Sequence, residues 1–157
     1  MRTRHLTIAA LAAVGLAVGL TGPVAAQRPG DRAFFAVLTG AKEVDADGQR
    51  GVGDRNGRGS FSATLDGREL CYGIQVKNIN DPVAAHIHRG RGSVAGPVVQ
   101  TLEHPEAGDP GSSSACVDLA ARLARRIVRK PGRFYVNVHT GDFPNGAVRG
   151  QLFARSR

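Results

Sequence analysis

Several features that carry catalysis or nucleic-acid recognition are missing from this 157-residue sequence. It holds only two cysteines and no C-x-x-C pair, which disfavours a metal-thiolate site. The serines at 112–114 have no nucleophile-elbow pattern around them, so nucleophilic catalysis finds no support. The net charge is +8, but no recognition motif accompanies it, so we expect no specific nucleic-acid binding. Because no catalytic constellation is recognised, the sequence favours a non-enzymatic protein.

A run long enough to span a membrane is also missing. The apolar run at 6–20 has 15 residues, whereas a membrane-spanning helix needs about 20. The basic stretch before it and the small residues at 24–26 after it complete the layout of a secretory signal peptide. We therefore expect cleavage after Ala26 and a secreted protein, extracellular or periplasmic; an uncleaved anchor is the alternative. The expected division is a signal peptide over 1–26, a polar tether over 27–32 and one domain over 33–154.

The two cysteines fit an exported protein. An even number of cysteines in a small exported domain favours a disulfide bond between Cys71 and Cys116. In the chain-entropy model, a bridge across a loop of this length stabilises the fold by roughly 3 to 4 kcal/mol. A free thiol pair or a metal-thiolate site is the weaker alternative, because the two residues are far apart in the sequence.

Short runs of alternating apolar residues predict strands in most of the remaining chain. Phe61, Ala63 and Leu65 share one face, and the Asp-Gly dipeptide at 66–67 is a strong hairpin signal. The run at 70–76 alternates in the same way, so two antiparallel strands follow one another directly. Further short runs bounded by turn residues cover 33–38, 84–88, 97–102, 113–117, 134–139 and 147–153. We therefore expect an all-β fold, an antiparallel, Greek-key-like β-sandwich or barrel of about seven or eight short strands.

One segment has the period of a helix instead. Leu119, Leu123 and Ile127 are spaced i, i+4 and i+8, with Asp118 as the expected N-cap and a Pro-Gly pair as a stop. We expect one short amphipathic helix near 118–130. Its outer face carries Arg122, Arg125, Arg126, Arg129 and Lys130. The simpler interpretation is a solvated face whose cations suit the helix dipole; the alternative is an anion-binding patch.

Three longer stretches resemble one known family. They are AHIHRGRGSVAGPVVQTL from Ala85, SSSACVDLAARLARRI from Ser112 and GRFYVNVHTGDFPNGAVRGQL from Gly132. In this order they are similar to the CHRD (chordin-repeat) domain, which occurs in chordin-type extracellular antagonists and in single-domain bacterial proteins behind signal peptides. The resemblance implies an extracellular antiparallel β domain and little about its chemistry. It favours a secreted, non-enzymatic module that binds an extracellular or cell-envelope partner.

The same motifs contain histidines spaced like metal ligands. His86 and His88 flank one strand residue, so both imidazoles point to one face, about 7 Å apart along the backbone. His139 ends another strand, and it meets the other two if both strands reach the same edge of the sandwich. Three neutral imidazoles suit copper or zinc and leave a coordination position open. The competing hypothesis is therefore a copper- or zinc-binding protein with His86, His88 and His139 as ligands.

Other interpretations of these polar residues are open. Hydrogen bonds to backbone carbonyls or to a carboxylate such as Asp142 would fix the histidines as a polar turn cluster without metal. An H-x-H pair with a later histidine is also similar to the copper ligands of copper-zinc superoxide dismutase. The zinc-binding loop of that enzyme has no counterpart here, which disfavours dismutase chemistry. Arg149, in the last expected strand, either pairs with a buried carboxylate, the preferred interpretation, or brackets the histidines.

The signal-peptide interpretation predicts the N-terminus of the exported protein. When the chain is produced in an exporting host, N-terminal sequencing or intact mass should show a chain that begins at Gln27, because the small residues before it suit signal peptidase. Full-length protein embedded in the membrane would contradict this prediction.

Overall fold

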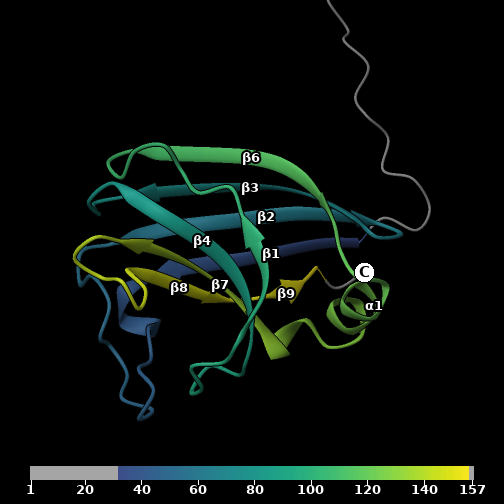
Figure 1. Ribbon diagram of the computed structural model, residues 1–157, viewed down its shortest axis with the longest axis horizontal. Coiled ribbons are helices and arrows are strands. Elements are labelled where there is room, and N and C mark those ends of the chain that lie inside the picture. The colour runs from purple at the N-terminus through teal and green to yellow at the C-terminus, as the bar shows by residue number, and fades with distance from the viewer. Residues whose placement is uncertain (1–31, 156–157) are drawn as a thin grey trace, which may run out of the picture.

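The structure, a computed structural model, describes residues 32–155 (Figure 1). The expected signal peptide and the tether up to Asp31 lie outside the described residues. The elements are β1 (Arg32–Thr39), η1 (Gly40–Lys42), β2 (Arg58–Asp66), β3 (Glu69–Lys77), β4 (Pro82–Arg89), β5 (Val98–Leu102), β6 (Gly111–Asp118), α1 (Ala121–Arg129), η2 (Pro131–Arg133), β7 (Phe134–Thr140), β8 (Val148–Gln151) and β9 (Phe153–Ala154). The stretch 147–153, predicted as one strand, is divided between β8 and β9, because β9 pairs with β1 instead of continuing along β7. Within residues 32–155, no helix is long and apolar enough to cross a bilayer.

The strands form one antiparallel sheet that curls into a nearly closed barrel (Figure 1). Its order is β5-β4-β7-β8-β1-β2-β3-β6, and β9 pairs with β1. Strands β1, β2 and β3 form a meander; the chain then crosses to the β4-β5 hairpin, and β6 returns to lie beside β3. The prediction of an all-β, antiparallel sandwich or barrel of about seven or eight short strands is therefore confirmed.

Alternating apolar side chains of the strands fill the barrel. In β2, Phe61, Ala63 and Leu65 are buried, while the residues between them are exposed, as the period of two predicts. The large, fully buried apolar side chains of the strands are Phe34, Leu38, Phe61, Leu65, Leu70, Ile74, Ile87, Val136 and Val138. The barrel interior is thus apolar, and polar chemistry is confined to its outer surface and its ends.

Helix α1 lies at one end of the barrel, and it begins later than the sequence predicts (Figure 1). Ala124 and Ile127 are buried against the core. The prediction that Asp118 is the N-cap is wrong, because Ala120 occupies that position without a side-chain hydrogen bond. The cause is the sheet: β6 continues through Asp118, which pairs with Glu69 of β3, so the chain turns into the helix only afterwards.

Strand β7 departs from the alternating pattern, because all seven of its residues are buried. Tyr135, Asn137 and His139 point to the outer face of the sheet, where side chains are usually in contact with solvent. The segments 90–97 and 141–147 fold over this face and contact it through hydrogen bonds. A polar layer therefore lies between the sheet and these two segments, and it contains the candidate site.

The two cysteines lie opposite each other on neighbouring strands. Cys71 of β3 and Cys116 of β6 are register partners and are joined by a disulfide bond across 45 residues of sequence. Because β6 is the last strand in the order of the sheet, the disulfide bond links an edge strand to its neighbour β3.

Removal of the disulfide bond should destabilise the domain. The double variant Cys71→Ser with Cys116→Ser should lose roughly 3 kcal/mol of unfolding free energy, because the unfolded chain regains the freedom of the closed loop. For a domain of this size, the melting temperature in a thermal scan should fall by about 10 °C. An unchanged melting temperature, or two free thiols in the non-reduced wild-type protein, would contradict the prediction.

Candidate metal centre

The pairing of β4 with β7 brings the three histidines to one place. The register sets His86 opposite Asn137 and His139 opposite Ala84, so His86 and His139 are diagonal neighbours across the two strands. His88 follows His86 on the same face, two residues further along β4. Side chains of this length bridge the diagonal spacing of an antiparallel pair, which is about 7 to 8 Å.

The three imidazoles form a compact cluster. One ring nitrogen from each of His86, His88 and His139 lies within 4.8 Å of the others. The shortest separation, 3.0 Å, joins His86 Nδ1 and His139 Nε2. Ring centroids are 4.9 Å apart for His86 and His139, 5.6 Å for His86 and His88, and 6.3 Å for His88 and His139. The prediction that the three histidines meet is therefore confirmed.

Backbone carbonyls fix the orientation of two rings. His88 Nδ1 lies 2.7 Å from the carbonyl oxygen of Gly96, and His139 Nδ1 lies 2.9 Å from that of Pro144. A carbonyl oxygen only accepts hydrogen bonds, so each Nδ1 carries a proton, and the lone pair of each neutral ring is on Nε2. Hydrogen bonds of this kind are typical of histidines that ligate metals, since they set the tautomer and direct the other nitrogen.

The remaining nitrogens face one another. Because His139 Nε2 holds a lone pair, His86 Nδ1 donates the proton in the 3.0 Å hydrogen bond between them. Moving that proton to the other nitrogen of His86 frees a third lone pair. Three atoms can then reach one ion: His86 Nδ1, His88 Nε2 and His139 Nε2.

The alternative of a metal-free, hydrogen-bonded cluster applies only in part. The carbonyl bonds of His88 and His139 are of the kind that it requires, but His88 Nε2 and Asn137 Oδ1 are both buried without a hydrogen-bond partner among residues 32–155. Both atoms are acceptors while His88 is neutral, so the hydrogen bond with Asn137 that raises the His88 pKa forms only in the protonated ring. Asp142, the carboxylate considered as a partner, accepts a hydrogen bond from Asn80 instead. Hydrogen bonding alone therefore leaves a buried lone pair unsatisfied, which is costly in an apolar environment.

The environment keeps the histidines neutral at physiological pH. Burial, together with electrostatic repulsion from His139 and His88, lowers the pKa of His86 to about 4. Burial also lowers the pKa of His88, with repulsion from His139 and against the hydrogen bonds with Gly96 and Asn137. It lowers the pKa of His139 as well, against the hydrogen bond to Pro144. All three rings thus present the neutral form that a metal ion requires.

Tyr135 and Arg149 hold His88 from the side of β7. The His88 ring stacks on the Tyr135 ring, with centroids 4.7 Å apart and an interplanar angle of 9°. The guanidinium carbon of Arg149 lies 3.4 Å from the centroid of the Tyr135 ring. Because β4 and β8 flank β7, the imidazole and the guanidinium reach Tyr135 from opposite sides. Arg149 Nη2 donates to the carbonyl oxygens of Arg91 and Val94, at 2.8 and 3.0 Å, which fixes the guanidinium.

The carboxylate expected beside Arg149 is Glu43. Both side chains are buried and interact electrostatically, yet within residues 32–155 they form no ion pair, and the direct partners of Arg149 are carbonyl oxygens and the Tyr135 ring. Glu43 Oε1 is buried with no hydrogen-bond partner in this part of the chain. Both interpretations of Arg149 are thus partly correct: a buried carboxylate lies near it, and through Tyr135 it brackets His88.

Sequence reasoning identified the histidines and missed the roles of two other buried side chains, Tyr135 beside His88 and Glu43 near Arg149. Tyr135 lies four residues before His139 in the same strand, so the period of two places both side chains on one face. Its position beside the cluster could therefore have been predicted from the strand pattern. Glu43 carried no such signal, because it lies outside the strands, at the start of a glycine-rich connection. Only the three-dimensional path of that connection makes it a buried residue.

The barrel and its covered histidine cluster define a class of small antiparallel β domain with a polar site on the outside of the sheet. The family model described as CHRD domain matches residues 34–152, and the chain belongs to this family. Family membership supports a non-catalytic domain. No curated protein and no solved structure matches the chain.

Glu43 predicts a pH dependence of stability. Burial raises its pKa from 4.5 to about 7, although Arg149 opposes the rise. The folded protein therefore keeps a proton that the unfolded chain loses, and this stabilisation is complete below pH 4.5 and lost as the pH rises through 7. From pH 4 to pH 8, the unfolding free energy of Glu43→Gln should rise by about 3 kcal/mol relative to that of the wild type.

Urea unfolding at both pH values measures this difference. Glu106→Gln, which removes an exposed carboxylate, controls for the change in net charge. A difference between Glu43→Gln and the wild type that stays constant from pH 4 to pH 8 would exclude a raised pKa for Glu43.

Proposed function

We propose that this CHRD domain binds one transition-metal ion, copper(II) more tightly than zinc(II), through His86, His88 and His139. The observation that carries the proposal is the convergence of three neutral imidazole nitrogens within 4.8 Å, one of which is buried without a hydrogen-bond partner in the described part of the chain. An ion placed among them satisfies that nitrogen, and the hydrogen bonds from Nδ1 of His88 and His139 are retained.

The ligand set favours these two metals. Neutral imidazole suits copper and zinc, whereas calcium and magnesium require oxygen ligands. Metal–nitrogen bonds of about 2.0 to 2.1 Å place tetrahedral ligand atoms roughly 3.3 Å apart. The cluster spans 3.0 to 4.8 Å between its nitrogen atoms, so small side-chain rotations suffice. A given site of this kind binds copper(II) more strongly than zinc(II).

Three protein ligands leave one position for water or another ligand. Together with family membership, this favours a protein that holds or senses a metal ion rather than one that transforms a substrate. The signal-peptide pattern and the disulfide bond support export, so we propose that the ion is bound outside the cytoplasm. Binding to an extracellular or envelope partner, the first prediction from the sequence, is compatible with a metal site and stays a prediction.

Metal analysis of the purified protein tests this proposal. After incubation with excess copper(II) or zinc(II) and removal of unbound ion, elemental analysis should give about one ion per chain for the wild type. The double variant His86→Ala with His88→Ala should retain less than about a tenth of that amount, because one imidazole alone binds weakly.

His104→Ala is the matched control. This exposed histidine lies outside the cluster, and its Nδ1 contacts the carbonyl oxygen of the neighbouring Pro105, so its loss should leave the bound metal unchanged. Wild-type protein that holds neither metal, or a His104→Ala variant that loses as much metal as the double variant, would overturn the proposal.

A further inference from the structure

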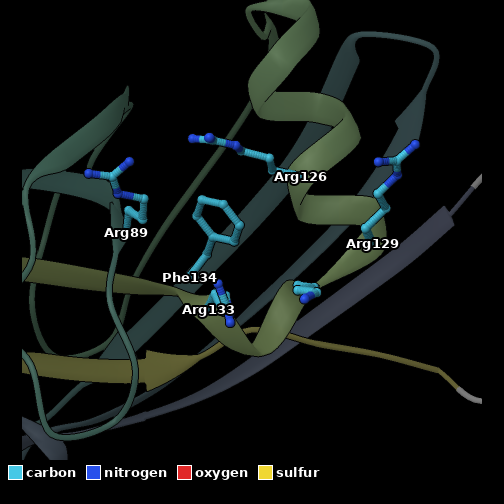
Figure 2. A pocket seen from close by; sticks show the side chains of 6 residues that line it. Arg89, Arg126, Arg129, Arg133 and Phe134 are labelled. Carbon is cyan, nitrogen blue, oxygen red and sulfur yellow. The ribbon is translucent and has the colours of Figure 1, made fainter.

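A basic cavity lies between the end of β4 and the C-terminal turn of α1, and the proposed metal centre does not include it. Its volume is about 410 Å³. The residues that line it are Arg89, Arg126, Arg129, Lys130, Arg133 and Phe134. Figure 2 shows the Phe134 ring between Arg89 and Arg126, with the side chain of Arg126 extended across the ring and Arg129 turned away.

Three neighbouring elements supply these cations. Arg89 is the last residue of β4 and pairs with Phe134 at the start of β7. Arg126 lies in the last turn of α1, and Arg133 lies in η2, which follows it directly. Gly90 N donates to the carbonyl oxygen of Arg133 at 2.9 Å, which holds the end of β4 against η2. The cavity is therefore built by the fold and does not depend on one helix face.

The charges in the cavity are all of one sign. Five of its six lining residues are basic, and none is acidic. Within residues 32–155, none of the five basic side chains makes a hydrogen bond or an ion pair. The helix dipole explains cations in the last turn of α1, but it does not explain Arg89 and Arg133, which belong to other elements. Like charges this close together repel one another, and a bound anion would offset this repulsion.

We infer that this basic cavity binds a phosphate ester. Guanidinium groups present paired donors that match phosphate oxygens, and three arginines from three elements surround the same apolar ring. The volume lies within the range of small-molecule sites, which is about 300 to 1,000 Å³. Phe134 lines the cavity, but only 2% of this side chain is exposed, so the aliphatic stems of the surrounding arginines supply most of the apolar contact for the carbon part of an ester. The same group occurs in free phosphate esters and in phospholipid headgroups.

Two probes distinguish these sources. Titration calorimetry with glycerol 3-phosphate measures binding of a free ester, and co-sedimentation with phosphatidylglycerol vesicles, against phosphatidylcholine vesicles, measures binding of a headgroup. The double variant Arg126→Gln with Arg133→Gln should bind the preferred probe at least about tenfold more weakly than the wild type, because two charged donors are lost.

The same helix offers a matched control. Arg122→Gln with Arg125→Gln removes two charges from exposed positions of α1 that do not line the cavity, so affinity should change by less than about twofold. Thermal scans of both variants establish that they are folded. Loss confined to the cavity variant supports the inference with either probe. Equal loss in both variants, or no binding of either probe by the wild type, overturns it.

Discussion

The antiparallel pairing of β4 with β7 is the interaction on which the rest of this structure depends. It joins the β4-β5 hairpin, which forms one end of the curved sheet, to β7 and through it to β8 and β1. The same register sets His86, His88 and His139 on one face and places Arg89 against Phe134 at the end of the ladder. Because the side-chain period is two, a shift of one residue would turn the histidines into the apolar interior. The fold, the histidine cluster and the basic cavity therefore depend on the same register.

The barrel carries its polar chemistry on the outside of the sheet and protects it with loops. Tyr135, Asn137 and Arg149 would be solvated on an uncovered sheet, but the segments 90–97 and 141–147 bury them. Burial then keeps the imidazoles neutral and keeps Glu43 protonated over part of the physiological range. The shifted pKa values of the site thus depend on the segments that cover the sheet as well as on the titratable residues themselves.

The sequence predicted the parts of this protein that depend on local patterns. Alternation located the strands, and the H-x-H spacing with a strand-ending histidine located the cluster, because both follow from a period of two. Long-range packing was not accessible in the same way. Asp118 has the chemistry of an N-cap, but pairing with Glu69 keeps it in β6. The role of Glu43, and the meeting of Arg89 with Arg126 and Arg133, depend on chain paths that no local pattern encodes.

The carbonyl oxygens that orient His88 and His139 have a consequence for mutational tolerance. Since the groups that hold the rings belong to the main chain, the side chain at position 144 is free to change as long as the loop keeps its path. Gly96 is different, because a β-carbon there would collide with the carbonyl oxygen of Arg89. Substitution by alanine would displace the oxygen that His88 needs. A scan of polar side chains would therefore miss the main-chain groups that orient the cluster, among them the carbonyl of a residue with no side chain.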